Sequence, residues 1–167
     1  MGTKEHKETA PDRVTVGIIT VSTSRTLVED QSGHWMSKQA KKEGHTVVHH
    51  TLIPDNLSLI RDTLMGVIRD YSPNVVLITG GTGISPKDLT IEAVRPLFSR
   101  ELTAFGVLFA HLSYEEIDAA ALLSRATAGI IYNSVVFSMP GSLKACKLAC
   151  KNLIFPEMGH LVRHMRE

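Results

Sequence analysis

The chain has 167 residues, of which 43% are hydrophobic, 21% are charged and 5% are aromatic. This length predicts one globular domain that buries roughly 70% of the surface its unfolded chain exposes, which excludes a scaffold held together by disulfides or a structural metal. The 18 Lys and Arg residues nearly balance the 17 Asp and Glu residues, giving a formal net charge of +1, so we expect no nucleic-acid binding through bulk charge and conclude that any anionic ligand must be held by local geometry.

The N-terminal stretch is polar, and we expect residues 1–12 to be disordered and residues 13–167 to form a single domain. The stretch lacks the apolar core of a signal peptide, and no segment approaches 18 consecutive apolar residues. The two cysteines, Cys146 and Cys150, lie four residues apart without CxxC spacing, which is typical of reduced thiols. These features indicate a cytoplasmic protein that does not associate with membranes.

Apolar strands alternate with amphipathic helices through the first hundred residues. The strands are continuously apolar, as in a parallel sheet covered on both faces. This alternation predicts an α/β fold with a mostly parallel sheet and right-handed connections. The expected elements are a strand within 13–22, a helix over 31–44, a strand over 46–53, a helix with Leu57, Ile60, Leu64, Val67 and Ile68 on its apolar face, a strand over 75–79 and a helix that ends at Leu97.

The last third of the chain combines helical patterns with a less regular stretch. Its β-rich runs are short, so the pattern predicts irregular or short antiparallel structure over residues 124–133 and a last core strand over 135–138. The residues with helical spacing are Phe105, Leu108, Phe109 and Leu112 in one segment and Leu148, Ala149 and Leu153 in another.

Four of the predicted strands end in loops of small or turn-forming residues. Ligands of open parallel sheets bind beyond the carboxyl ends of the strands, and parallel strands bring such loops to one edge. We therefore expect the functional site at that edge. The loops are Ser22-Thr23-Ser24-Arg25, Pro54-Asp55-Asn56, Thr79-Gly80-Gly81-Thr82-Gly83 and Met139-Pro140-Gly141-Ser142.

The glycine loop gives the strongest signal. Gly80, Gly81 and Gly83 follow a buried strand, and residues without a Cβ let backbone N–H groups approach a phosphate closely. The GK[ST] ending of a Walker A loop is missing, and Pro86 stands where a GxGxxG motif needs its third glycine. The alternative is a tight strand-to-helix turn that binds no ligand.

Two aspartates follow strands of the predicted sheet. Asp55 could cap the next helix, and Ser85-Pro86-Lys87-Asp88 fits a capping box with Ser85 at the N-cap. Their joint placement, at what we expect to be neighbouring strand ends beside a phosphate-binding loop, favours two carboxylates that hold Mg²⁺ against phosphate oxygens. We expect Asp55 and Asp88 to face one cavity whose floor is the glycine loop.

Other polar residues give weaker signals. Asp30, Ser32 and Gly33 open the first helix, where helix capping is the simplest role. His160 and His164 have the i, i+4 spacing of metal ligands, but no third ligand accompanies them in the sequence, so we do not expect a metal there. The basic residues that could neutralise phosphate charge, or simply face solvent, are Arg25, Lys87, Arg125 and Lys144.

Seven short motifs occur in order between Asp30 and Ser142. They are Asp30-Gln31-Ser32-Gly33, Ile53-Pro54-Asp55, Thr79-Gly80-Gly81-Thr82-Gly83, Asp88-Leu89-Thr90-Ile91-Glu92-Ala93, Ser113-Tyr114-Glu115-Glu116-Ile117, Leu123-Ser124-Arg125-Ala126 and Met139-Pro140-Gly141-Ser142. In kind and order these motifs are similar to those of the MoaB/MogA family of molybdenum cofactor biosynthesis proteins. The resemblance extends over nearly all of the chain from Val14 onward.

The resemblance implies a three-layer α/β/α molybdopterin-binding fold, assembled as a homo-oligomer that is either a trimer or a hexamer. It implies the adenylylation of molybdopterin, in which the terminal phosphate of the pterin attacks the α-phosphate of ATP and pyrophosphate leaves. Mg²⁺ is the implied cofactor, ATP and molybdopterin are the implied substrates, and other cofactor-biosynthesis proteins are implied as partners. Molybdenum and tungsten remain open as the metal finally delivered.

The resemblance also assigns roles to residues. Asp55 and Asp88 match the catalytic, magnesium-associated pair of the family. The implied nucleotide- and phosphate-binding residues are Thr79, Gly80, Gly81, Thr82, Gly83, Pro140, Gly141 and Ser142, and the implied pterin-binding residues are Ser22, Arg25, Asp30, Ser32, Ser124 and Arg125.

The chain departs from the family pattern in three places, none of which touches the two aspartates. Ala104-Phe105-Gly106-Val107 replaces the usual Gly-Phe-Gly-Glu, Asp118-Ala119-Ala120 replaces small polar residues, and Ile91 stands where proline is common. A molybdopterin-binding or assembly protein without adenylyltransferase activity is therefore the alternative. Hydrolysis of another nucleotide, as in competence-damage-inducible proteins, is a third hypothesis, which the absence of their additional domain disfavours.

Overall fold

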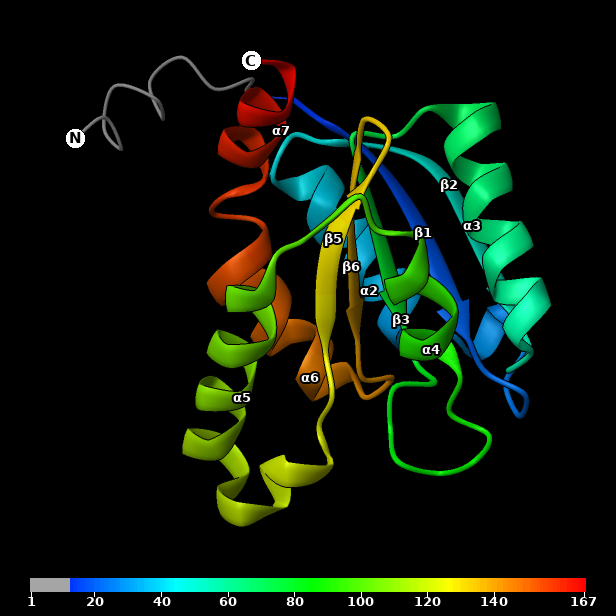
Figure 1. Cartoon of the computed structure of the whole chain (residues 1–167), viewed down its shortest axis with the longest axis vertical. Coiled ribbons are helices and arrows are strands. Elements are labelled where there is room, and N and C mark those ends of the chain that lie inside the picture. Colours follow the sequence, from blue (N-terminus) through cyan, green and yellow to red (C-terminus); the bar gives the residue numbers. More distant parts are fainter. Residues whose placement is uncertain (1–12) are drawn as a thin grey trace.

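A computed structural model describes residues 13–167, which form a six-stranded sheet in the order β2-β1-β3-β6-β5-β4 with helices on both faces (Figure 1). The expectation of disorder for residues 1–12 lies outside the described residues. Four strands run parallel, whereas β5 is antiparallel to β6 and β4 is antiparallel to β5. The mostly parallel sheet and the short antiparallel structure are confirmed. The strands are β1 (Thr15–Val21), β2 (Thr46–Ile53), β3 (Val75–Thr79), β4 (Arg100–Glu101), β5 (Thr127–Ile131) and β6 (Ser134–Met139).

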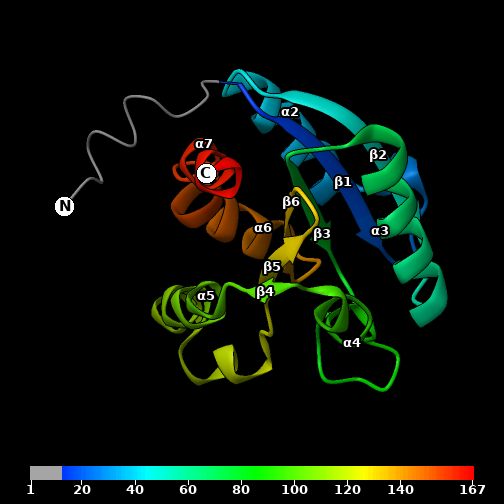
Figure 2. The ribbon, with the colours of Figure 1, turned by 45° about the horizontal axis from the view of Figure 1, so that its top comes forward.

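The helices form two layers, which confirms the three-layer architecture (Figure 2). One layer contains α2 (Gln31–Lys42), α5 (Thr103–Ile117), α6 (Leu143–Ala149) and α7 (Met158–Arg166), and the other contains α3 (Leu57–Tyr71) and α4 (Thr90–Val94). The connecting turns are the 3₁₀ helices η1 (Leu27–Glu29), η2 (Arg95–Leu97) and η3 (Asp118–Leu123) and the π-helical segment η4 (Cys150–Ile154). Among residues 13–167, no helix has the length and apolar character needed to cross a membrane.

The alternation of side chains along each strand divides the core in two. In β1, Val16 and Ile18 pack toward α2 and α6, while Ile19 and Val21 pack toward α3 and α4. All five residues of β3 are buried, because helices cover both faces of the sheet. The apolar face predicted for α3 is confirmed, since its buried residues are Ile60, Leu64, Val67 and Ile68, with Leu57 packed beside them.

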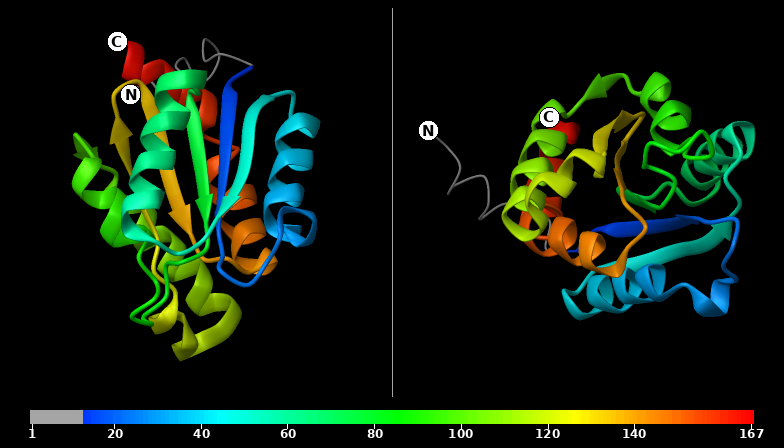
Figure 3. Two further views of the ribbon diagram at one scale, coloured as in Figure 1. Left: turned by 90° about the vertical axis from the view of Figure 1, so that its right-hand side faces the viewer. Right: turned by 90° about the horizontal axis from the view of Figure 1, so that it is seen from below.

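The strand register aligns the carboxyl ends of the parallel strands. Thr20 of β1 pairs with Thr79 of β3, and Thr79 pairs with Met139 of β6, while Val21 pairs with Ile53 of β2. The four loops named above therefore leave the sheet side by side, at the lower end of the molecule in Figure 1 and toward the viewer in the right panel of Figure 3. β1 lies between β2 and β3, so the prediction that Asp55 and Asp88 follow neighbouring strands is wrong.

The helix predicted to have Ser85 as its N-cap begins only at Thr90. Residues 85–88 instead form a turn in which the Asp88 backbone N–H donates to the Ser85 carbonyl at 2.9 Å, and the Ser85 N–H donates to the Asp88 carboxylate at 2.9 Å. The helix start is fixed because the Thr90 N–H donates to the Gly81 carbonyl at 2.9 Å. Ser85 is therefore not a helix cap, and Asp55 is not one either, because Asn56 caps α3 through a 2.9 Å bond from the Leu59 N–H.

Two glycine substitutions should change stability in opposite directions. A Cβ at Gly129 of β5 would lie 2.3 Å from the Phe98 ring, so Gly129→Ala should destabilise the fold by about 1–3 kcal/mol through overpacking. Gly66, within α3, has only an arginine side-chain tip at 3.8 Å, and Gly66→Ala should stabilise by about 0.5–1 kcal/mol because alanine favours the helix. Urea unfolding of both variants measures the difference, and equal effects would contradict this packing.

Candidate functional site

A cavity of about 320 Å³ opens where the four loops meet at the carboxyl edge of the sheet. Its walls come from segments that are far apart in the sequence, as the view from below in Figure 3 shows. The structure thus brings the four loops together around one cavity at this edge. The lining residues are Val21, Ser22, Thr23, Ser24 and Arg25 after β1, Asp55 after β2, Gly80 to Gly83, Lys87 and Asp88 after β3, Leu123 from η3, and Pro140 and Gly141 after β6.

The glycine loop lies directly against both predicted carboxylates. A Cβ placed on Gly81 would stand 2.6 Å from Asp55 Oδ1, and a Cβ on Gly83 would stand 2.6 Å from Asp88 Oδ2. Gly80 and Gly81 also have positive φ angles of 96° and 65°, which disfavour any side chain. Gly80 and Gly81 therefore require glycine. The two carboxylates approach the same short stretch of backbone, although β1 separates the strands that they follow.

One oxygen of Asp55 has no hydrogen-bond partner. Asp55 Oδ2 accepts from the Thr23 hydroxyl at 3.1 Å, whereas Oδ1 is buried and unpartnered, and so is the hydroxyl oxygen of Thr82. Buried polar atoms are nearly always satisfied, so these oxygens in the cavity wall are candidate ligand atoms. Carboxylate oxygens beside a phosphate-sized cradle fit Mg²⁺, which usually takes one or two carboxylates and completes its shell with phosphate and water oxygens.

Asp30 does not line any of the described cavities. It is fully buried, accepting bonds from the Thr20 hydroxyl at 2.6 Å, the His50 ring at 2.8 Å and the Gly33 backbone N–H at 2.9 Å. Burial by itself raises the pKa of Asp30, but the bonds from His50, Thr20 and Gly33 outweigh it, so the pKa lies below its ordinary value. Asp30 thus caps α2, the role that its place in the sequence first suggested. The family resemblance assigns Asp30 to pterin binding, and a buried side chain can affect the pterin only indirectly, through the residues that it holds in place.

Thr79 and Ser32 also lie behind the cavity rather than in its wall. The Thr79 hydroxyl donates to the Pro140 carbonyl at 2.9 Å, and the Ser32 hydroxyl donates to the Gly141 carbonyl at 2.9 Å. These two hydrogen bonds hold the loop after β6 against the sheet and against α2. The buried Cys146 thiol lies 3.0 Å from the Thr79 hydroxyl, and burial raises its pKa.

Two further cavities adjoin the first. One of about 400 Å³ shares Pro140 with it and includes Ser124 and Ser142, two of the predicted ligand-binding residues, together with Lys144. The other, of about 330 Å³, includes Arg25, Ser32 and Gly141. The structure thus places the predicted nucleotide and pterin residues, except Asp30, Thr79 and Arg125, around three adjoining cavities. Ser142 also caps α6 by accepting from the Ala145 N–H at 3.1 Å.

Arg125 contacts the glycine loop and not the cavity. Its guanidinium donates to the carbonyls of Thr82 and Gly83 and to the carboxylate of Glu92. The prediction that this arginine faces the pterin is therefore not supported by its geometry, because its side chain is directed to the back of the loop.

Three residues were missed from the sequence. Thr23 accepts from the Asp55 N–H at 3.2 Å and binds the Asp55 carboxylate, and Thr90 holds the glycine loop through its hydroxyl and its N–H. His50 binds Asp30 at 2.8 Å. The position of Thr23 in a strand-end loop was a usable signal, whereas His50 and Thr90 act through contacts that no local pattern reveals.

His160 and His164 face one another on α7, with their Nε2 atoms 3.0 Å apart and Glu157 bonded to His160 at 3.0 Å. Within residues 13–167, no group of three or more His, Cys, Asp or Glu side chains converges in the manner of a metal cluster.

Comparison with known proteins identifies the family. The sequence profile described as a probable molybdopterin binding domain matches residues 17–160. Molybdenum cofactor biosynthesis protein B of Bacillus subtilis is 45% identical, covering 100% of this chain and 99% of the relative. A probable molybdopterin adenylyltransferase of Methanocaldococcus jannaschii is 39% identical over 90% of this chain and 93% of its own length. The crystal structure of a tungsten cofactor synthesizing protein, MoaB from Pyrococcus furiosus, has a TM-score of 0.86 at 39% identity and covers 95% of this chain and 100% of that one.

The fold and the site define a three-layer α/β protein with a glycine loop and two carboxylates at the carboxyl edge of its sheet. The chain belongs to the MoaB/MogA family of molybdopterin-binding domains. The resemblance drawn from the seven sequence motifs is confirmed.

The buried Asp30 network should contribute to stability in a pH-dependent way. Asp30→Ala leaves buried donors unsatisfied and removes a helix cap, which should cost about 3 kcal/mol. The folded pKa of Asp30 is depressed, so its contribution is fully present above the unfolded value of about 3.9 and is lost as pH falls through the folded pKa. Urea unfolding at pH 7 and at decreasing pH below 4 measures both effects.

The control for this experiment is Asp70→Ala, which removes an exposed carboxylate paired only with the neighbouring Arg69 and should change stability by about 0.5 kcal/mol or less. An Asp30→Ala variant as stable as this control at pH 7 would contradict the network.

Proposed function

We propose that the chain is a molybdopterin adenylyltransferase, which transfers AMP from ATP to the terminal phosphate of molybdopterin with the help of Mg²⁺. The observation that carries the proposal is the unpartnered Oδ1 of Asp55 in a cavity that Asp88 also lines, with both carboxylates against the glycine loop. Relatives named for molybdenum cofactor biosynthesis, and one named as a probable molybdopterin adenylyltransferase, support it.

The reaction joins two polyanions, so positioning and charge neutralisation matter more than a general base. A phosphate oxygen of the pterin forms a bond to the α-phosphorus of ATP, the bond from that phosphorus to the bridging oxygen of the β-phosphate breaks, and pyrophosphate leaves. Mg²⁺ held by Asp55 and Asp88 would offset the charge that develops on the phosphate oxygens. In this proposal the N–H groups of Gly81, Thr82 and Gly83 and the Thr82 hydroxyl bind nucleotide phosphate, while the Gly80 N–H is held by the Met139 carbonyl at 3.0 Å.

The pterin is assigned to the adjoining hollows. Ser22 and Arg25 line the first cavity, and Ser124 and Ser142 line the second, so each can reach a ligand that extends beyond the glycine loop. Lys87, exposed in the cavity wall, supplies positive charge for the phosphates. Ser32 lines the third cavity, whereas Asp30, Thr79 and Arg125 act indirectly, by holding the backbone of these walls.

The sequence departure at Val107 does not favour a protein without activity. Val107 lies on α5, is 69% exposed, and lines none of the three cavities at the carboxyl edge. The missing family carboxylate is therefore remote from the proposed chemistry. The proposed reaction serves a molybdenum or a tungsten cofactor equally, and one similar structure is described as a tungsten cofactor synthesizing protein.

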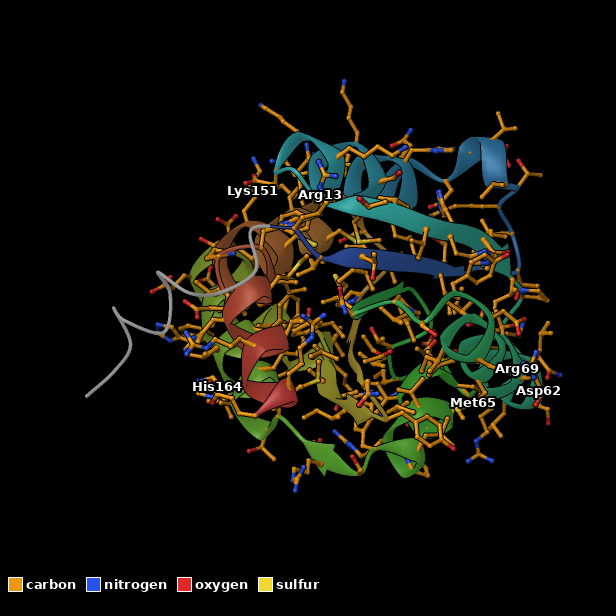
Figure 4. The ribbon with its side chains drawn as sticks, turned by 90° about the horizontal axis from the view of Figure 1, so that it is seen from above. Arg13, Asp62, Met65, Arg69, Lys151 and His164 are labelled. Atoms are coloured by element: carbon orange, nitrogen blue, oxygen red, sulfur yellow. The ribbon has the colours of Figure 1, made fainter. Side chains whose placement is uncertain are left out.

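Asp55→Asn and Asp88→Asn should each lower the rate of adenylylation by roughly 10²-fold or more, because each removes a charge that positions Mg²⁺ against phosphate. Product formation from molybdopterin, ATP and Mg²⁺ measures the rate. The matched control is Asp62→Asn on the outer side of α3 (Figure 4), which should retain the wild-type rate.

The same assay decides between the enzyme and the binding protein. Pyrophosphate release that depends on both molybdopterin and ATP supports the transferase. Binding of molybdopterin by calorimetry without any pyrophosphate would support the assembly protein instead, and wild-type rates in both aspartate variants would overturn the assigned chemistry.

We also propose that the protein is a homo-oligomer, assembled through the outer face of α5 and η3. α5 carries apolar residues around its whole circumference, which is typical of a helix that is covered on every side. Yet several of its large side chains are exposed, and a contiguous apolar surface of this kind usually marks a protein interface. The exposed residues are Val107, Leu108, Tyr114 and Ile117 on α5 and Leu122 and Leu123 on η3.

Leu108→Glu and Leu122→Glu should shift the molar mass in light scattering from a multiple of 18.3 kDa toward the monomer, because each places a charge in the covered surface. Leu59→Glu, on the exposed side of α3, should leave the mass unchanged. A wild-type chain that is monomeric at micromolar concentration would contradict the assembly.

We also propose that the protein is cytoplasmic, where the buried free thiols of Cys146 and Cys150 would stay reduced.

A further inference from the structure

We propose that Arg125 is a positioning residue, which orients the second half of the glycine loop for phosphate binding while Glu92 holds its guanidinium in place. The inference rests on the proposed function of the cavity, and it replaces direct contact between Arg125 and the ligand.

The Arg125 guanidinium binds the backbone of the glycine loop on one side and Glu92 on the other. Arg125 Nε donates to the Thr82 carbonyl at 2.9 Å and to the Gly83 carbonyl at 3.1 Å, and Nη2 donates to the Gly83 carbonyl at 2.7 Å. Nη1 donates to the Glu92 carboxylate at 2.7 Å. All three nitrogens are engaged, so the contacts use the planar fork of the arginine and not its charge alone.

Every carbonyl group of the glycine loop accepts a hydrogen bond. The Thr90 hydroxyl donates to the Gly80 carbonyl at 2.8 Å, and the Thr90 N–H donates to the Gly81 carbonyl at 2.9 Å. With the two bonds from Arg125, each carbonyl from Gly80 to Gly83 is bound by a group behind the loop. Thr90 fixes the first half of the loop, and Arg125 fixes the second.

The bonds to the carbonyl groups also set the direction of the N–H groups of the loop. In a planar trans peptide the N–H points opposite to the carbonyl of the same unit. Carbonyls of Thr82 and Gly83 that face Arg125 therefore turn the N–H groups of Gly83 and Ile84 away from it. Gly83 lines the cavity and Arg125 does not, so an anion would meet N–H donors and not carbonyl oxygens. A cation bound to the carbonyls also polarises these peptide units and strengthens their donors.

Glu92 provides the other half of the arrangement. It lies on α4, two residues after Thr90, so the two supports of the loop come from one short helix and the side chain of Arg125. The hydrogen bond from Arg125 holds the pKa of Glu92 below its ordinary value. The Glu92 carboxylate therefore restrains the guanidinium at Nη1, in addition to the loop carbonyls that bind its other nitrogens.

The test compares Arg125→Ala, Arg125→Lys and Glu92→Gln with the wild type. Calorimetric titration with Mg²⁺ and pyrophosphate measures phosphate binding without turnover, and steady-state assays measure kcat and KM for ATP. Arg125→Ala and Arg125→Lys should each weaken pyrophosphate binding and raise the KM about 10-fold or more, because lysine keeps the charge but cannot hold two carbonyls and a carboxylate. Glu92→Gln should have a smaller effect, about three-fold.

Arg69→Ala is the matched control, because Arg69 also pairs with one carboxylate but lies at the far end of α3 (Figure 4). It should bind pyrophosphate as the wild type does. Thermal unfolding accompanies each variant, and if Arg125→Ala does not fold, the comparison rests on Arg125→Lys and Glu92→Gln. Faster amide hydrogen exchange at Gly83 and Ile84 in Arg125→Lys would support the positioning role.

Each outcome is decisive. Wild-type affinity and KM in Arg125→Lys overturn the proposal, because charge alone would then suffice. A wild-type protein that binds pyrophosphate but forms no adenylylated product overturns the proposed reaction, while loss of that binding in Arg125→Lys still supports the positioning role. A wild-type protein that does not bind pyrophosphate overturns both.

Discussion

The carbonyl groups of the loop from Gly80 to Gly83 all bond to the body of the protein, so the planar peptide units direct the N–H groups of residues 81–84 away from those bonds. A strand end has no intrinsic reason to expose donors only, since each peptide unit carries a donor and an acceptor. Thr90 and Arg125 make the difference. Because both bind the carbonyl groups of the loop, a phosphate can approach without meeting carbonyl oxygens, and the two aspartates lie against the same short stretch of backbone.

The parallel sheet supplies the frame for this arrangement. Its register brings the ends of β1, β2, β3 and β6 to one edge, so short loops are enough to enclose a cavity. Continuous burial of β3 on both faces keeps the base of the glycine loop rigid, and a rigid base is what a preorganised anion site requires. The loop after β6 is held in the same way, by hydroxyl groups of Thr79 and Ser32 that bind its carbonyls.

Several polar residues that the family resemblance assigns to ligand contact lie behind the walls. Asp30 is sealed beneath α2, and Arg125 is directed to the rear of the glycine loop. A short motif in a protein of this kind therefore contains both residues that face the ligand and residues that hold them. The two roles differ in what a substitution would change, since a wall residue affects chemistry directly and a supporting residue acts through the backbone.

The sequence by itself determined the layers and the edge that carries the site, because apolar periodicity, glycine and turn residues act over a few neighbouring positions. It also singled out Asp55, Asp88 and the glycine loop. Only the tertiary structure decided that β1 lies between the strands of the two aspartates, and that residues 85–88 form a turn held by backbone bonds. It alone revealed the contacts of Arg125 with Glu92, which are 33 positions apart. Such pairings depend on how distant segments pack, and no local pattern encodes them.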